Sequence, residues 1–241
     1  MNKEVKNIEK FKSIIENSNN IVFFGGAGVS TESGIPDFRS KDGLYNQKYK
    51  YMPEQILSHT FFKYKVQDFY AFYKDKLNCI NVEPNITHKK LAKLEEIGKL
   101  KAIITQNIDG LHFKAGSKNV CELHGSIYRN YCQNCNKFYE AKDVFLTTQT
   151  IPLCACGGII KPDVVLYEEM LDDNIVNKAI YYIANADTLI VAGTSLSVFP
   201  ASSLIKYFKG SNFVYINEDE KVTCSASLTI NDKLGNVFSK I

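Results

Sequence analysis

The sequence lacks the features of membrane, secreted and nucleic-acid-binding proteins. It contains no run of about 18 apolar residues, so no membrane association is expected. The first residues, MNKEVKNIEKFK, are charged and unlike a signal peptide, which predicts a cytoplasmic protein. The net charge is only +3, and the lysines are scattered rather than gathered in a dense stripe, so direct nucleic-acid binding is not expected.

Short apolar runs alternate with amphipathic helical patterns along most of the chain. This alternation is typical of an α/β fold with a mostly parallel, Rossmann-like sheet covered on both faces. The 241 residues are 45% hydrophobic, enough for one sizeable core with or without a small appendage. Strands are expected at residues 20–24, 101–105, 119–123, 163–167, 188–192, 213–216 and 227–230, and helices at 3–18, 87–98, 172–186 and 200–208.

Four of the seven cysteines form two close pairs. The motifs are CQNC and CAC, separated by 18 residues, at Cys132, Cys135, Cys154 and Cys156. Without a secretion signal, such pairs indicate a metal site rather than disulfides. Four thiolates and no histidine or carboxylate among the ligands favour one closed, structural Zn²⁺ site. The single cysteines, Cys79, Cys121 and Cys224, are expected to be small buried hydrophobic residues.

Two segments depart from the alternation of strands and helices. Residues 41–85 are rich in Tyr, Phe and Lys and contain a helical stretch without a strand, and residues 126–159 carry the paired cysteines. We interpret both as insertions that form a smaller helical and zinc-binding module over the cleft. The Rossmann-like domain then comprises residues 1–40, 86–125 and 160–241.

The first apolar run, IVFF, leads directly into the glycine-rich turn GGAG. Small residues there would let the backbone approach a pyrophosphate. The usual dinucleotide fingerprint has a third glycine three residues after Gly28, but Thr31 stands there. The acidic residue expected about 20 residues later has no clear candidate either, although Asn217 or the acids after it could replace it. A plain tight turn therefore remains an alternative.

Nearly every expected strand ends in a polar or glycine-rich cluster. Because ligands bind outside the carboxyl ends of parallel strands, these clusters should meet in one cleft. The residues brought together would include Gly26, Asn107, His124, Ser195 and Asn217.

Two of these clusters favour chemistry over a structural role. A turn explains one or two residues of TQNID, but not Gln106, Asn107 and Asp109 together after four apolar positions. An aspartate there could accept a hydrogen bond from a carboxamide such as that of nicotinamide. A lone histidine is more often structural, but the position of His124 in the cleft suits a general base.

Together the motifs resemble those of the sirtuins, NAD-dependent protein lysine deacylases, and especially the short bacterial group. The similar stretches cover nearly the whole chain in order: GAGVSTESGIPDFRS, TQNIDGLH, ELHGS, the four cysteines, KPDVVLYEE, GTSLSVFPA and VYIN. The resemblance implies that NAD⁺ is a co-substrate and that acetylated lysine in proteins or peptides is the substrate. The products would be free lysine, nicotinamide and O-acyl-ADP-ribose.

The same resemblance implies a role for individual residues. His124 and Asn107 would be catalytic, with His124 as general base, and Asp109 would hold the nicotinamide carboxamide. The NAD⁺ site would comprise Gly26, Ala27, Gly28, Thr31, Asp37, Phe38, Arg39, Gln106, Asn107, Ile108, Asp109, His124, Gly193, Thr194, Ser195, Asn217 and Leu234 (or Lys233). The substrate backbone would add as a strand to Val164, Val165, Leu166 and Tyr167.

The sequence departs from the pattern of the family at Gly25, where the family often has threonine, at the short C-x-C half of the cysteine motif, and at YEE, Tyr167 to Glu169. YEE replaces the usual FGE after the peptide-binding strand, so the loop could differ in stiffness or peptide preference. Sirtuins that remove succinyl or malonyl groups carry a tyrosine followed three residues later by an arginine. Here Tyr70 is followed by Tyr73, which leaves a dicarboxylic acyl group without a cation and favours acetyl or a longer apolar acyl group.

Three other functions compete with deacylation. Protein mono-ADP-ribosyl transfer could use the same activated ribose, but the presence of His124 and Asn107 favours deacylation. A non-catalytic NAD sensor or zinc-bearing interaction module would be expected to lack one of His124, Asn107 and Asp109. Dehydrogenase activity is disfavoured by the missing glycine and the missing ribose-binding acid.

Overall fold

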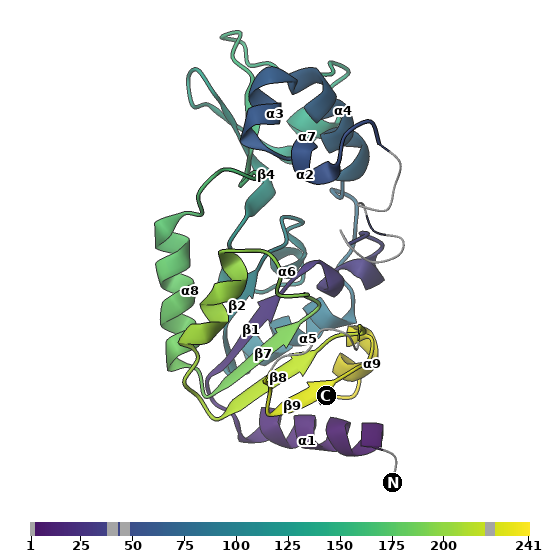
Figure 1. Ribbon diagram of the computed structural model, residues 1–241, viewed down its shortest axis with the longest axis vertical. Coiled ribbons are helices and arrows are strands. Elements are labelled where there is room, and N and C mark those ends of the chain that lie inside the picture. Colours follow the sequence, from purple (N-terminus) through teal and green to yellow (C-terminus); the bar gives the residue numbers. More distant parts are fainter. Residues whose placement is uncertain (1–2, 38–42, 44–48, 220–224) are drawn as a thin grey trace.

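The computed structural model describes residues 3–37, residue 43, residues 49–219 and residues 225–241. It consists of a larger part built on a parallel sheet and a smaller part above it in the view of Figure 1. Phe38, Arg39 and Cys224, which the sequence singles out, lie outside the described residues. Among the described residues, no helix has the length and apolarity that a membrane span requires.

The larger part contains a six-stranded sheet in the order β3-β2-β1-β7-β8-β9, and all its neighbouring strands are parallel. The α/β, Rossmann-like prediction is therefore confirmed. The strands are β1 (Ile21–Gly25), β2 (Leu100–Thr105), β3 (Val120–Glu122), β7 (Thr188–Ala192), β8 (Asn212–Ile216) and β9 (Leu228–Ile230).

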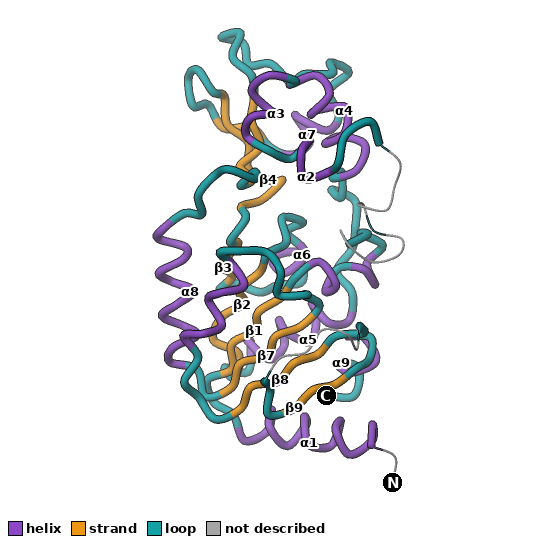
Figure 2. The backbone as a smooth tube through the Cα atoms, viewed as in Figure 1, coloured by secondary structure: helices purple, strands orange, loops and turns teal. Residues whose placement is uncertain are grey.

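Helices cover both faces of this sheet (Figure 2). Alternate residues of β1 face opposite clusters, so that Phe23 packs with one set of helices and Phe24 with the other. The first face is covered by α1 (Lys3–Asn17), α5 (Ile86–Glu96) and α9 (Leu234–Phe238). The opposite face is covered by α8 (Asp173–Asn185) and the 3₁₀ helix η4 (Ala201–Tyr207). A short helix, α6 (Leu111–Lys114), follows the end of β2.

The smaller part combines an antiparallel sheet, in the order β5-β4-β6, with four helices. Its strands are β4 (Gly125–Cys132), β5 (Phe138–Tyr139) and β6 (Ile160–Val164), and its helices are α2 (Pro53–Ile56), α3 (His59–Tyr64), α4 (Val66–Lys76) and α7 (Ala141–Phe145). Gly125 has φ +75°, and a Cβ there would lie 1.9 Å from the carbonyl oxygen of Asp163. Only glycine therefore permits this close approach of β4 to β6.

The placement of β6 corrects one expectation. The apolar run at residues 163–167 predicts a strand of the parallel sheet, but β6 begins at Ile160 and pairs antiparallel with β4. The hydrophobic cluster of the smaller part continues past residue 159 to Leu166. An apolar run shows that a strand is buried, but it does not show which sheet buries it. The division of the chain into domains at residue 160 stays a prediction.

Candidate active site

The glycine turn after β1 packs against the loop after β7. The N–H of Gly26 donates to Ala192 O at 3.2 Å, and that of Gly28 to Gly193 O at 2.8 Å. A Cβ on Gly28 would lie 2.8 Å from the Cα of Gly193, so a side chain would push the two loops apart. The glycines thus let the two loops pack closely. The N–H of Ala27 has no hydrogen-bond acceptor among the described residues, so it could donate to a phosphate.

A serine that sequence reasoning missed joins two of the predicted site residues. The hydroxyl of Ser30 donates to Oδ2 of Asp109 at 2.6 Å and accepts from Nδ2 of Asn107 at 3.1 Å. The other carboxylate oxygen of Asp109 accepts from the N–H of Leu111 at 2.9 Å. Ser30 lies within the GAGVS motif, but nothing in the sequence indicates that its side chain would reach the residues that follow β2.

Asp109 is almost fully buried. Only 5% of its surface is exposed. This burial raises the pKa of the carboxyl group, and the hydrogen bonds from Ser30 and Leu111 act in the opposite direction. The carboxylate therefore already accepts two protein hydrogen bonds, and its remaining lone pairs could accept an amide N–H from a ligand.

His124 follows β3 and is held in one tautomer. Its Nδ1 lies 2.8 Å from the carbonyl oxygen of Gln106, and because a carbonyl only accepts, Nδ1 carries the proton. Nε2 of the neutral ring is then left with its lone pair. Burial lowers the pKa of His124, which outweighs the hydrogen bond to Gln106. The imidazole is therefore neutral and able to accept a proton near pH 7.

A second network joins the ends of β2, β7 and β8. Nε2 of Gln106 donates to Oγ1 of Thr194 at 3.2 Å, and Nδ2 of Asn217 donates to Thr194 O at 3.0 Å. Asn217 also donates to the hydroxyl of Tyr215, which donates in turn to Thr194 O, both at 2.8 Å. The polar groups at the strand ends therefore converge at one edge of the sheet, as the parallel fold predicts.

The remaining residues of the predicted NAD⁺ site occupy different surroundings. Thr31 is exposed and donates to Gly28 O at 3.1 Å, and Asp37 is partly buried. Ile108 accepts a backbone hydrogen bond from Ile127 at 3.0 Å and packs against the smaller part.

Two predicted contacts for the adenosine half differ sharply in exposure. Ser195 is exposed, and its hydroxyl lies 2.7 Å from that of Ser197. Leu234, at the start of α9, is only 4% exposed because its side chain packs in the core of the larger part. The neighbouring N–H of Gly235 donates to a carboxylate oxygen of Glu32 at 2.6 Å, which links α9 to the loop after the glycine turn. Any adenine contact at Leu234 stays a prediction.

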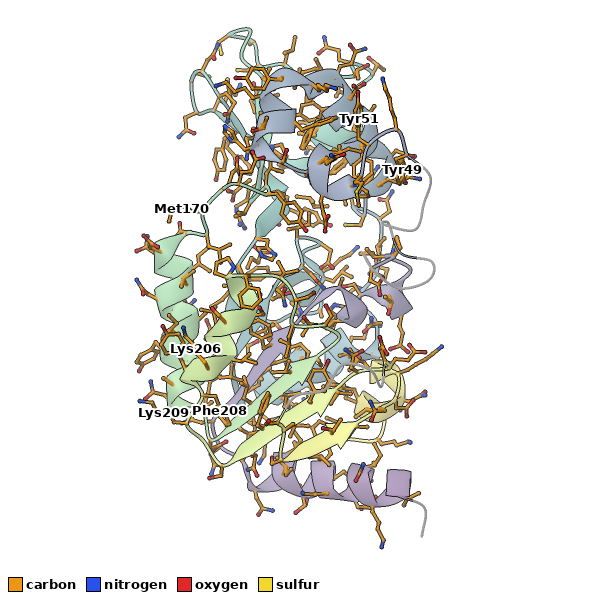
Figure 3. The ribbon with its side chains drawn as sticks, viewed as in Figure 1. Tyr49, Tyr51, Met170, Lys206, Phe208 and Lys209 are labelled. Atoms are coloured by element: carbon orange, nitrogen blue, oxygen red, sulfur yellow. The ribbon has the colours of Figure 1, made fainter. Side chains whose placement is uncertain are left out.

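The predicted substrate edge lies at the end of β6 and just beyond it, at Val164, Val165, Leu166 and Tyr167. Part of its backbone is already paired: Val165 N–H donates to His124 O at 3.0 Å, and Tyr167 N–H donates to Leu57 O at 2.9 Å. On the other side, Leu166 N–H donates to a carboxylate oxygen of Glu169 at 2.9 Å. Met170, which follows Glu169 on the connection to α8, is 86% exposed (Figure 3).

The four paired cysteines come together at one end of the small sheet. Their Sγ atoms all lie within 4.8 Å of one another, with separations of 3.4 to 3.6 Å in the closest pairs. Zn–S bonds of about 2.3 Å in a tetrahedron place the sulfurs roughly 3.8 Å apart, so the cluster fits zinc and not disulfides. A Cβ on Gly158 would lie 2.6 Å from Sγ of Cys132, which explains the glycine beside the CAC motif.

Comparisons with known proteins agree with this geometry. A model of the Sir2 family matches residues 26–200. A protein of Clostridium perfringens named NAD-dependent protein deacetylase is 59% identical over 239 residues, which cover 97% of this chain and 98% of that protein. A protein of the same name from Clostridium acetobutylicum is 56% identical over 238 residues, covering 97% of each.

The chain belongs to the Sir2 family. Among solved Sir2 structures, one with a p53 peptide and NAD⁺ is similar with a TM-score of 0.84 and 36% identity, covering 97% of this chain and 96% of that one. Another, bound to a propionylated peptide, gives a TM-score of 0.84 at 35% identity with the same coverage. The resemblance to sirtuins is thereby confirmed.

The two tyrosines at the acyl-specificity positions of sirtuins are fully buried here. Tyr70 donates a hydrogen bond to Ile160 O. The Tyr73 ring is stacked against Phe69 and Phe145 at centroid distances of 5.5 and 5.2 Å, and its hydroxyl has no partner among the described residues. In this arrangement no cation stands at position 73, as the sequence indicated, and a guanidinium placed there would enter a packed aromatic stack.

Proposed function

We propose that this sirtuin removes acetyl groups from protein lysine side chains. Acetyl-lysine, NAD⁺ and water would give lysine, nicotinamide and O-acetyl-ADP-ribose. The observation that carries the proposal is the constellation of Asn107, Asp109 and His124 at one edge of the sheet, joined by Ser30 and Gln106. Membership of the Sir2 family, with relatives named NAD-dependent protein deacetylases, supports it.

Within the proposed reaction, the glycine turn and the loop after β7 would bind the dinucleotide. The free N–H of Ala27 would donate to a phosphate, and Thr194, Ser195 and Asn217 would contact the phosphates and the adenosine half. Asp109 would accept the amide N–H of the leaving nicotinamide, with its carboxylate oriented by Ser30. Phe38, which would shield the exposed ribose carbon from water, lies outside the described residues.

His124 would act after nicotinamide has left. The acetyl oxygen attacks the ribose carbon that nicotinamide leaves, and a ribose hydroxyl then loses its proton to Nε2 of His124 and attacks the former acetyl carbon. The bond from that carbon to the lysine nitrogen would then break, with the nitrogen leaving as the protonated amine. Water would add to the carbon in its place and lose a proton, which gives O-acetyl-ADP-ribose. The Nδ1–H of His124, bound to Gln106 O, keeps Nε2 free to take the proton.

The other partners and the location follow from the same proposal. The substrate backbone would pair with the edge formed by Val164, Val165, Leu166 and Tyr167, and the zinc site would stabilise the module that carries this edge. None of the six cysteines that the structure describes forms a disulfide, which supports a reducing, cytoplasmic location. We propose no direct role for nucleic acid or membrane binding.

One measurement tests the proposal. Nicotinamide release from NAD⁺ is followed with no peptide, with an acetyl-lysine peptide and with a matched succinyl-lysine peptide. We expect release that depends on the acetyl peptide, with free lysine peptide in equal amount. The succinyl peptide should react far more slowly, because position 73 carries a tyrosine and not a cationic side chain. ADP-ribose on the protein, with no deacetylated peptide, would instead support mono-ADP-ribosyl transfer and refute the proposal.

A further inference from the structure

An arginine joins the larger and smaller parts close to His124. From β4, Nη1 of Arg129 donates to Oε2 of Glu122, and Nε donates to Oδ2 of Asp163, both at 2.7 Å. Glu122 is the last residue of β3 in the parallel sheet, whereas Asp163 belongs to β6 in the small sheet. Figure 1 shows β4 at the connection between the two parts. The guanidinium thus ties the edge of one sheet to the other.

The two ion pairs differ in burial and therefore in strength. The Glu122 side chain is 6% exposed and that of Asp163 is 44% exposed. Burial raises the pKa of Glu122, and the hydrogen bond and charge of Arg129 oppose that effect. A buried carboxylate loses much more than a solvated one when its cation is removed. The contact between Arg129 and Glu122 should therefore contribute most of the energy that links the two sheets.

His124 is close in sequence or through a hydrogen bond to both segments that Arg129 binds. Glu122 precedes His124 by two residues, and Asp163 precedes Val165 by two residues. The N–H of Val165 donates to the carbonyl oxygen of His124 at 3.0 Å. Arg129 thus binds the chain two residues before His124 and two residues before Val165, whose hydrogen bond fixes the His124 backbone.

We infer that Arg129, through Glu122, is a positioning residue for the imidazole of His124. This inference rests on the deacetylase function proposed above. Within the described part of the chain, the side-chain hydrogen bonds of Arg129 go to Glu122 and Asp163, and neither of these is assigned to the dinucleotide. Arg129 therefore acts on the backbone that directs Nε2 of His124. Steps that need the base should depend on Arg129, whereas nicotinamide departure and return, which precede the base, should depend on it much less.

The test compares deacetylation with exchange of labelled nicotinamide into NAD⁺ in the presence of acetyl peptide. For Arg129→Gln we expect a loss of about tenfold or more in kcat for deacetylation, which is part of the 10²–10⁴-fold that a positioned base contributes in full. Exchange should keep a rate close to normal, and KM for NAD⁺ should not change. Asp163→Asn is the matched control and should deacetylate at close to the normal rate, because its contact with Arg129 is half exposed.

Two further variants separate positioning from simple stability. Arg129→Lys should recover part of the lost kcat, because an ammonium keeps a positive charge for Glu122 but lacks the planar, fixed donors of the guanidinium. Glu122→Gln combined with Arg129→Gln removes both charges of the pair, and should restore the melting temperature without restoring kcat. Recovery of normal deacetylation in this double variant, or equal loss of both reactions in Arg129→Gln, would overturn the inference. Failure of the unmodified protein to release nicotinamide would instead overturn the proposed function.

Discussion

A single hydrogen bond decides what His124 can do. The carbonyl oxygen of Gln106 accepts a hydrogen bond from the Nδ1–H, and the partly buried ring has a pKa below its usual value. The unprotonated form is therefore present over most of the physiological range. Deacetylation should rise with pH through an acid limb whose midpoint lies below about 6.5, the ordinary value for imidazole.

The variant His124→Ala should lose at least about a hundredfold in deacetylation, since a general base contributes 10²–10⁴-fold. Some exchange of labelled nicotinamide should survive, because that reaction precedes the need for a base. NAD⁺ binding should weaken much less, since the proposed phosphate contacts come from the glycine turn and the loop after β7. Both rates and the dissociation constant of NAD⁺ are measured on folded, zinc-loaded protein.

Asp109→Asn provides the contrast for this prediction. An amide in place of the carboxylate weakens capture of the nicotinamide carboxamide, so exchange should fall along with deacetylation. A His124→Ala protein that deacetylates at close to the normal rate would show that the proposed mechanism is wrong.

At the scale of secondary-structure elements, a buried histidine pair joins α5 to α6. The rings of His88 and His112 lie 4.8 Å apart and are 0% and 2% exposed. Burial lowers the pKa of His88 to about 4 and that of His112 well below its usual value. The structure places both histidines in the packing between helices rather than among the polar groups of the site.

This pair should make the stability of the protein sensitive to acid. Both histidines have folded-state pKa values below the unfolded value of about 6.5, so the unfolded state binds more protons as the pH falls. Their contribution is fully present above about 6.5 and is lost as the pH falls towards 4. For His88 alone the loss between pH 7 and pH 5 is about 2 kcal/mol of unfolding free energy.

The measurement is the free energy of unfolding at several pH values for the unmodified protein, His88→Gln and His59→Gln. The first variant should show a shallower fall between pH 7 and pH 5. His59 is 53% exposed, so its variant is the control and should follow the unmodified protein. Equal slopes in all three proteins would contradict the assignment of acid sensitivity to the buried pair.

For the whole molecule, the sequence predicted the class of the fold and the convergence of distant strand ends, because parallel strands impose both. It did not predict that β6 belongs to the small sheet, since a buried apolar run fits either sheet. It also missed Ser30 and Arg129, whose contacts with Asp109 and Glu122 form only when the chain has folded. Motif spacing records which residues follow one another, but not which side chains meet across two elements.

The two parts of the molecule have separate hydrophobic cores, and the metal ligands belong to the smaller one. Cys132 and Cys154 are buried members of its cluster, together with residues of β6 and of the helices. Binding energy of a structural zinc is folding energy, so losing the metal should loosen the smaller part. The proposed substrate edge would be lost with it, while the glycine turn, in the larger part, would still bind the dinucleotide.

We therefore expect one zinc per chain by elemental analysis of protein purified without added metal. Cys132→Ala should lose the zinc and lower the melting temperature, with weak NAD⁺ binding kept and peptide binding lost. Cys79→Ala is the matched control, because Cys79 is a buried thiol of the same cluster outside the metal set, and it should keep the zinc. A stable, metal-free and fully active Cys132→Ala protein would contradict a structural zinc at the four cysteines.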